Sequence, residues 1–483
     1  MALLLLLAVL ATCSLFVPGG QLSALALLGH HANHGQYSIQ SQNHHQNRAK
    51  HLVSRLKAPF QPRLVYNETP ADFAPTWLTT PKYDIPPVVY IYTMPNQCQT
   101  LPAYLLVTFM QAVRSQPDAD VIFASNFHAC QKTLNSIKNI HGLKLIDTAE
   151  VLSSKTASFS NSSFELFKHG NNDNSLWRAS TLRFFEMEDI MERFGYAELI
   201  HMEADNLLYQ NLSSIVEVLR TSYPMAVTPL LANKSMFTAS IFWVSSLNFL
   251  KEFTDFLMGI SLNREDLWKK YMAFLRRWFC CKKGGPDPDS NGVGVKPFSI
   301  NEMTMLAFYH QIRSDTMKLL PVLPVSASYP MRRPFCDLKQ FMPGGREVGP
   351  ITPPGVWDSG SWGQHLGGTW IKRGRDAGFI DSSHVIGQAL MLAACEVKML
   401  CTDGTRRSLA RELNVSAAVE LEPPESVKFT DSFYRTAHTA PFVRCGDEAS
   451  SMTMSSWTPL WNLHVHSKHT ARFLSRPCSI SDP

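Results

Sequence analysis

Apolar strands and amphipathic helices alternate along the middle of this 483-residue chain, and this alternation constrains the fold more than any other feature. The run 88–93 is short and rich in β-branched residues after a proline pair, as a buried first strand would be. A helical pattern follows over 101–113, then strands over 120–125 and 143–147. The alternation predicts an α/β fold with a mostly parallel central sheet and helices on both faces.

A long helix then leads into an acidic strand end. Residues 175–195 place their apolar side chains on one wide face, and they run directly into an apolar strand that begins at Leu199. That strand ends at Glu203 and Asp205, and a second helix follows over 211–220. Alternate residues of a strand point the same way, so both carboxylates can face one spot. Open α/β sheets bind ligands at this end of their strands.

Two carboxylates at such a corner suit Mn²⁺ or Mg²⁺, because these ions prefer oxygen ligands. A cation held there would in turn hold the diphosphate of a substrate. A solvated acidic turn that caps the next helix explains the same residues without a ligand, and both interpretations stay open at this point.

The amino terminus is the clearest targeting signal. Residues 1–17 carry no charge and end at Pro18-Gly19-Gly20, which predicts a secretory signal sequence or a short signal anchor within 1–25. We therefore expect the protein in the secretory pathway, in the Golgi or ER lumen or secreted, with membrane association only if the segment stays uncleaved. Five N-x-Ser/Thr sequons, at Asn67, Asn161, Asn211, Asn233 and Asn414, agree with this location.

Composition supports one large domain rather than a nucleic-acid-binding protein. The net charge of +5 is mild and scattered, so no nucleic-acid partner is expected. Residues 26–85 look like a low-order stem, and 86–470 like a single domain with an inserted loop near 280–296 and a tail over 471–483. A polar loop is expected around 153–175. Ten cysteines are too few for a disulfide scaffold, and their pairing cannot be read from the sequence.

Further chemistry-bearing side chains lie outside the acidic corner. Arg178 and Arg183 occupy the first turns of the 175–195 helix, where an arginine can meet an anion. The segment GVWDSGSWGQHLGGTW, residues 355–370, is rich in glycine and tryptophan, which predicts an ordered loop with close backbone approaches. The segment WNLHVHSKHT alternates His464 and His466 on one face of a short strand.

Three of these segments together resemble a known family. Glu203-Ala-Asp205 resembles the Asp-x-Asp motif of GT-A glycosyltransferases, and GVWDSGSWGQHLGG and NLHVHSK are similar to segments of glycosyltransferase-like proteins. The resemblance spans 88–468. It implies a Rossmann-like GT-A fold and transfer of a sugar from a nucleotide-diphospho-sugar donor to a glycan, protein or lipid acceptor.

The resemblance also implies roles for individual residues. Asp205 would bind the divalent metal, and Glu203 would contact the ribose or the metal. His464 or His466 would supply a further metal ligand, and Lys468 would meet the donor phosphates. Tyr92 and Thr93, at the end of the first strand, would lie against the nucleotide base. The glutamate at 203 departs from the usual aspartate, so Asp205 is the firmer metal ligand.

Departure of a diphosphate builds negative charge that cations can stabilise, so Arg178, Arg183 and Lys468 could assist it. Asp358 is the candidate general base or acceptor-orienting acid, and Trp357 and Trp362 are candidates for stacking on sugar faces. A turn-forming aspartate and core tryptophans explain these residues equally well.

Two other functions fit the same residues. Paired carboxylates hydrolyse glycosides without a metal when they lie about 5 Å apart, and the close spacing of Glu203 and Asp205 is compatible with this distance. A non-catalytic secreted carbohydrate-binding protein would keep the fold without turnover. Activity that survives a chelator would favour the hydrolase over the transferase. Glycan binding that needs no nucleotide would favour the binding protein.

Overall fold

The computed structural model describes residues 84–93, 101–126, 137, 140–169, 172–173, 175–279, 300–324, 338–343, 348, 355–369, 377–378, 380–392, 395–402, 438–446, 457–466, 468 and 470–475. The chain divides into two compact units, Met1–Pro75 and Thr76–Pro483, and all described residues belong to the second. The predicted signal segment over 1–25, nearly all of the predicted stem and the loop near 280–296 lie outside the described residues. Within them, no helix is long and apolar enough to cross a membrane.

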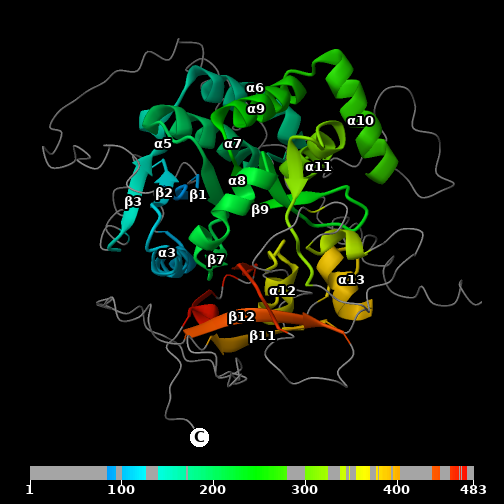
Figure 1. Cartoon of the computed structure of the whole chain (residues 1–483). Helices are drawn as coiled ribbons and strands as arrows, with labels where there is room; N and C mark the ends of the chain where they lie inside the picture. Colours follow the sequence, from blue (N-terminus) through cyan, green and yellow to red (C-terminus); the bar gives the residue numbers. More distant parts are fainter. Residues whose placement is uncertain are drawn as a thin grey trace, which may run out of the picture. The chain divides into compact units, whose positions relative to one another are not determined.

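A seven-stranded sheet forms the centre of this unit, in the order β3-β2-β1-β6-β9-β8-β10 (Figure 1). Six strands run parallel to one another: β1 (Val88–Ile91), β2 (Val121–Ser125), β3 (Leu143–Asp147), β6 (Leu199–Met202), β8 (Met225–Pro229) and β10 (Met317–Leu319). Only β9 (Phe237–Val244) within this sheet runs antiparallel to its neighbours. The predicted mostly parallel sheet is confirmed.

Helices cover both faces of the sheet, as predicted. Alternate residues of β1 enter different cores: Val88 and Tyr90 join one, and Val89 and Ile91 join the other. The first core receives α3 (Ala103–Ser115) and α8 (Val216–Ser222). The second receives α6 (Ser154–Phe167), α7 (Ser175–Phe194), α9 (Leu247–Ser261), α10 (Glu265–Phe279) and α11 (Glu302–Ile312).

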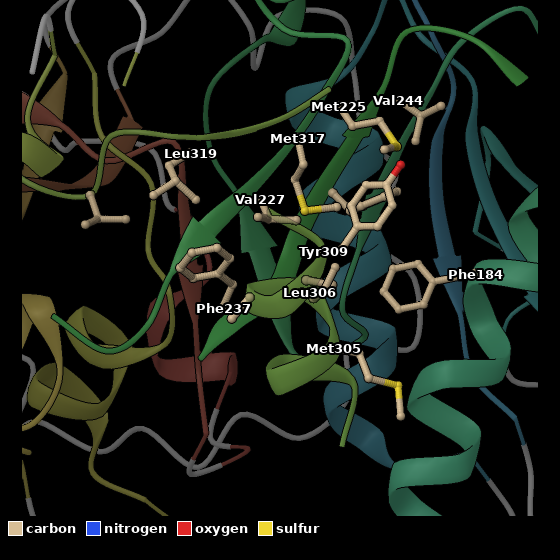
Figure 2. Packing of buried hydrophobic residues seen from close by; sticks show 14 of the residues in the cluster. Phe184, Met225, Val227, Phe237, Val244, Met305, Leu306, Tyr309, Met317 and Leu319 are labelled. Atoms are coloured by element: carbon tan, nitrogen blue, oxygen red, sulfur yellow. The ribbon is translucent and has the colours of Figure 1, made fainter. Parts of the chain in front are cut away.

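The second core is rich in aromatic side chains. Phe184 of α7 makes edge-on contacts with Phe242 of β9 and Phe253 of α9, each with ring centroids 5.1 Å apart. Figure 2 shows part of this core, with Phe184 and Tyr309 beside sheet residues such as Met225. Burial of one such phenylalanine contributes about 1.5–3 kcal/mol, so this face fixes α7 firmly against the sheet.

The prediction of a polar loop over 153–175 is wrong, because most of it forms α6. Serine and asparagine favour turns over helix interiors, but tertiary contacts outweigh that preference here. Phe159 stacks on Phe185 of α7 with centroids 4.1 Å apart. Lys155 Nζ also pairs with Glu188 of α7 at 2.9 Å.

Smaller elements complete the unit. They are α5 (Thr148–Val151), β4 (Lys168–His169), β5 (Asn172–Asp173), β7 (Asn206–Leu208), η3 (Leu212–Ser214), η5 (Leu338–Phe341), α12 (Ser361–Gly367), α13 (Val385–Leu392), β11 (Cys395–Thr402), β12 (His438–Cys445), β13 (Thr458–Pro459), β14 (Asn462–His464) and η10 (Thr470–Phe473). A disulfide between Cys395 and Cys445 joins the ends of β11 and β12.

The packed structure continues past residue 470, where the sequence predicts the tail to begin. The side chain of Gln111 on α3 donates to Ser475 Oγ at 3.0 Å, and Ser475 N donates back to Gln111 Oε1 at 3.1 Å. Both residues are buried. The domain therefore extends at least to Ser475.

Glu186 on α7 makes the stability of this fold depend on pH. Its side chain is buried, and Oε2 has no hydrogen-bond partner among the described residues. Burial, with a smaller effect of Asp189, raises its pKa to about 7. The folded state therefore holds a proton that the unfolded state has released, and stability falls as pH rises from about 4.5 through about 7.

We expect Glu186→Gln to be more stable than the wild type at pH 8, by up to about 3 kcal/mol, with the difference shrinking toward pH 4.5. Urea unfolding at several pH values measures it. Glu150→Gln, at an exposed glutamate on α5, should change stability at pH 8 by less than about 0.5 kcal/mol, because surface substitutions have small effects. A constant difference for Glu186→Gln would contradict the prediction.

Candidate active site

The acidic corner lies where the order of the sheet reverses. β2 and β3 lie on one side of β1, and β6 lies on its other side. Ligands of open α/β sheets bind beside the carboxyl ends of the strands that flank such a reversal. Tyr92 and Thr93 follow β1 directly, and Glu203 follows β6. The carboxyl ends of both strands thus carry residues predicted for the site.

A two-stranded ribbon brings the carboxy-terminal histidine to this corner. β7 pairs antiparallel with β14, with His464 opposite Asn206. Val465 N donates to the carbonyl of Asp205 at 2.9 Å, which extends the ribbon by one bond. Pairing of these strands places His464 beside residues more than 250 positions earlier in the chain.

Glu203, Asp205 and His464 form a compact cluster. His464 Nε2 lies 3.1 Å from Asp205 Oδ1 and 3.4 Å from Glu203 Oε2. One ligand atom from each residue lies within 4.8 Å of the other two. Asp205 and His464 are buried, and Glu203 is half-buried. Among the described residues this is the cluster whose geometry suits a metal ion.

The charges of the cluster stabilise one another. Burial raises the pKa of Asp205, but His464 and Lys468 outweigh burial and hold it well below its ordinary value. Glu203 behaves likewise, because Arg183 and His464 lower its pKa more than burial raises it. Burial lowers the pKa of His464, and the two carboxylates raise it above the ordinary value. The raised pKa favours the protonated form of His464 beside the two acids, which also pair with Arg183 and Lys468.

The donor set fits a divalent cation. Two carboxylate oxygens and one imidazole nitrogen converge, and carboxylates are the ligands that Mg²⁺ and Mn²⁺ prefer. The imidazole favours Mn²⁺ over Mg²⁺, since Mg²⁺ binds oxygen ligands almost exclusively. A bound ion would supply positive charge beside the two carboxylates, in place of a proton on His464.

Arg183 and Glu302 extend the site beneath the acids. Arg183 Nη1 donates to Glu203 Oε1 at 2.8 Å, and Nη2 lies 3.6 Å from Glu302 Oε1. Both residues are buried. Burial, opposed by Arg183, raises the pKa of Glu302 to about 7. No local sequence pattern predicts Glu302 as a site residue, because its contact with Arg183 depends on the docking of α11 against α7.

Lys468 and His466 also reach the cluster. Lys468 forms an ion pair with Asp205, and its ammonium lies 5.2 Å from the ring centroid of Tyr104. The ring of His466 stacks on that of His464, with centroids 4.2 Å apart. Burial and the neighbouring His464 lower the pKa of His466 to about 3, so this second histidine is neutral.

Arg178 takes a different direction from Arg183. Its guanidinium lies over the ring of Phe164 on α6, 5.3 Å from the centroid. The two arginines are five positions apart on α7, and five residues is not a whole number of helical turns. The two side chains therefore leave α7 in different directions, Arg183 toward Glu203 and Arg178 toward α6.

The structure corrects the expectation that Asp358 is a general base. Gly360 N and Trp362 N donate to its Oδ1 at 2.7 and 3.0 Å, and Gly363 N and His464 N donate to its Oδ2, each at 2.9 Å. A carboxylate has about four lone-pair sites, and all of them are occupied. Asp358 is fully buried and holds the loop and His464 in place.

The expectation that Trp357 and Trp362 stack on sugars is also wrong. Both side chains are fully buried, and Trp357 stacks on Trp461 with centroids 5.4 Å apart. The predicted close backbone approaches of this loop are present. A Cβ at Gly363 would lie 2.0 Å from the carbonyl oxygen of His464, and one at Gly360 would lie 2.6 Å from His466 Nε2.

Solved structures resemble parts of this chain. The PaToxG glycosyltransferase aligns with 39% of this chain at 9% identity and a TM-score of 0.28, and this chain covers 65% of it, less than two thirds. Mouse xyloside xylosyltransferase 1 aligns with 50% of this chain and 88% of its own, at 10% identity and a TM-score of 0.34. The galactosyltransferase LgtC, solved with donor and acceptor sugar analogues, aligns with 49% and 73%, at 10% identity and a TM-score of 0.26.

These matched structures are glycosyltransferases, the class that the acidic corner resembles. Each likeness is loose and partial, and none assigns a role to a residue of this chain. No protein-family model matches the chain, and no curated protein matches its sequence. A functional proposal must therefore rest on the geometry of the cluster of Glu203, Asp205 and His464.

Proposed function

We propose that this protein is a metal-dependent glycosyltransferase that moves a sugar from a nucleotide-diphosphate donor to a glycan, protein or lipid acceptor. The observation that carries the proposal is the convergence of Glu203, Asp205 and His464 at the reversal of the sheet. Two acids and an imidazole at the carboxyl end of β6 provide a cation site where a donor diphosphate would lie.

Each residue of the cluster has a distinct task in this proposal. Asp205 and His464 would hold Mn²⁺ or Mg²⁺, which supplies Lewis-acid stabilisation of the departing diphosphate. Arg183 fixes Glu203 through a 2.8 Å bond to Oε1, so that Oε2 keeps its direction toward the cluster. Lys468, now paired with Asp205, can turn to the donor phosphates once a cation neutralises that carboxylate.

Glycoside hydrolysis by Glu203 and Asp205 fits the geometry less well. His464 Nε2 lies within 3.4 Å of both carboxylates, so an imidazole occupies the space between them that a hydrolase leaves for its sugar. Arg183 and His464 lower the pKa of Glu203, and His464 and Lys468 lower that of Asp205. Both acids are therefore ionised, whereas a hydrolase needs one of the pair protonated.

We place the activity in the secretory pathway, in the Golgi or ER lumen. The apolar segment over 1–17 and the sequons support this location. The disulfide between Cys395 and Cys445 supports it too, because such bonds persist in oxidising compartments.

Calorimetric titration of UDP and GDP into the full chain, with Mn²⁺ and with EDTA, tests the proposal. We expect at least one nucleotide to bind with Mn²⁺ and to lose its binding in EDTA. Absence of any metal-dependent nucleotide binding, in protein whose circular dichroism shows it folded, would reject the transferase. Glycan binding without nucleotide would then favour a carbohydrate-binding protein.

A further inference from the structure

One backbone carbonyl of the central sheet holds both ends of the acidic corner. The carbonyl oxygen of Ser240 on β9 accepts from Glu203 N at 3.1 Å and from the side-chain Nδ2 of Asn206 at 2.5 Å. Asn206 N also donates to the carbonyl of Glu203 at 3.0 Å, which closes a four-residue turn. Glu203 and Asp205 are the first and third residues of this turn. Asn206 therefore fixes the backbone that carries both carboxylates of the cluster.

A second asparagine joins this corner to the strand that carries the histidine. Asn462 Nδ2 on β14 donates to Asn206 Oδ1 at 2.8 Å. Asn462 lies two positions before His464, and the pairing of β14 with β7 sets His464 directly opposite Asn206. Both asparagine side chains are fully buried. The two amides thus bridge β7 and β14 beside the proposed metal ligands.

The amide of Asn462 also holds the loop residue that anchors His464. Its Oδ1 accepts from Asp358 N at 2.9 Å, and its Nδ2 donates to the carbonyl of Asp358 at 3.1 Å. The side chain of Asp358 in turn accepts from His464 N. The amide pair therefore connects to all three residues of the cluster, through the turn on one side and through Asp358 on the other.

Backbone groups at the two ends of the pair fix the orientation of both amides. Ser240 offers a carbonyl oxygen, so Asn206 turns Nδ2 toward it. The N–H of Asp358 can only donate, so Asn462 turns Oδ1 toward it. Nδ2 of Asn462 then faces Oδ1 of Asn206, and each amide serves as donor and acceptor at once. A carboxylate lacks the donor, and an apolar side chain lacks both groups.

We propose that Asn206 and Asn462 are positioning residues that set the distance between the two carboxylates and His464, and with it the affinity of the site for Mn²⁺. This inference rests on the proposed function. The ligands come from a turn and a strand far apart in the chain, and the amide pair joins these two segments beside them. Without the pair the turn and the strand can shift, so that fewer ligand atoms reach one cation at once.

The test measures Mn²⁺ binding to the full chain by electron paramagnetic resonance, without nucleotide and with UDP or GDP. Circular dichroism identifies a temperature at which each variant is folded. We expect Asn206→Leu and Asn462→Leu each to lower the affinity for Mn²⁺ about 10–100-fold, as replacement of residues behind metal ligands typically does. The double variant should lose no more than the larger single loss, because either change already breaks the same bridge.

Gln116→Met is the matched control for loss of a buried amide. Gln116 Oε1 accepts from Leu212 N at 3.0 Å, and its Nε2 donates to the carbonyl of Gln210 at 2.6 Å. This side chain is buried but does not contact the cluster. Its replacement should lower the urea midpoint, as the asparagine variants do, and leave the affinity for Mn²⁺ unchanged.

Asn206→Ala serves where Asn206→Leu does not fold, because the space it leaves can admit a water beside the carbonyl of Ser240. Wild-type Mn²⁺ affinity in the folded asparagine variants, an equal loss in Gln116→Met, or losses that add in the double variant would overturn the positioning role and leave the transferase intact. A wild type that binds no Mn²⁺, with or without UDP or GDP, would overturn the metal site and this inference together.

Discussion

Replacing Asp205 by asparagine should abolish Mn²⁺-dependent binding of UDP and GDP. Asp205 faces His464 through Oδ1 and Lys468 through Oδ2, so its charge balances two cationic neighbours. An asparagine would keep the shape of the side chain and remove that charge. A cation would then find one carboxylate, that of Glu203, in place of two beside His464.

The expected loss in metal affinity is on the order of 100-fold or more, because even residues behind the metal ligands cost 10–100-fold when they are replaced. The fold should survive. Lys468 is 39% exposed and can turn to water, and His464 can release its proton once Asp205 no longer raises its pKa.

Titration of Mn²⁺ followed by UDP or GDP measures this effect. Asp266→Asn, at an exposed aspartate on α10, controls for a general change in charge and should bind as the wild type does. EDTA treatment of the wild type should reproduce the Asp205→Asn result. Nucleotide binding that survives in Asp205→Asn would show that the diphosphate lies elsewhere or needs no cation.

Local patterns in the sequence predict the half of the site that lies on the sheet. The apolar run before Glu203 shows where a strand ends, and the alternation of strands and helices shows that this end faces a ligand crevice. The structure confirms this sheet and places the acids at its reversal. The sequence predicts Arg183 as a residue that meets an anion of the donor, whereas the structure pairs it with the carboxylate of Glu203.

Local sequence patterns do not predict contacts between segments that are far apart in the chain. His464 reaches Asp205 only because β14 pairs with β7, and the sequence suggests this only through a family resemblance. Glu302 contacts Arg183 because α11 docks beside α7. No local pattern encodes either contact, since both are set by packing between segments far apart in the chain.

The wrong prediction of a loop where α6 forms has a different cause. Its composition, rich in serine, predicts a loop because serine side chains compete for backbone hydrogen bonds. Phe159, which packs on α7, supplies the burial that composition alone does not reveal. Tertiary packing thus overrides a weak local preference.

Asp358→Asn should destabilise the protein rather than merely slow a reaction, which distinguishes an anchoring carboxylate from a catalytic base. Four backbone N–H groups donate to its two oxygens. An asparagine offers one carbonyl oxygen, and its NH₂ group would face two N–H donors. At a fully buried position, each donor left without an acceptor costs about 1–3 kcal/mol.

We therefore expect a loss of about 2–6 kcal/mol in the free energy of unfolding, measured by urea denaturation. Asp315→Asn, at a 73% exposed side chain, should change stability by less than about 1 kcal/mol, because surface ion pairs contribute little.

The same variant should weaken Mn²⁺ binding even where it remains folded. Asp358 Oδ2 accepts from His464 N, so a displaced loop moves the imidazole away from Asp205. A general base would give the opposite pattern, with full stability, unchanged metal affinity and a reduced kcat. Asp358 thus links the glycine- and tryptophan-rich loop to the metal site, because the carboxylate that orders the start of α12 also fixes the strand that carries His464.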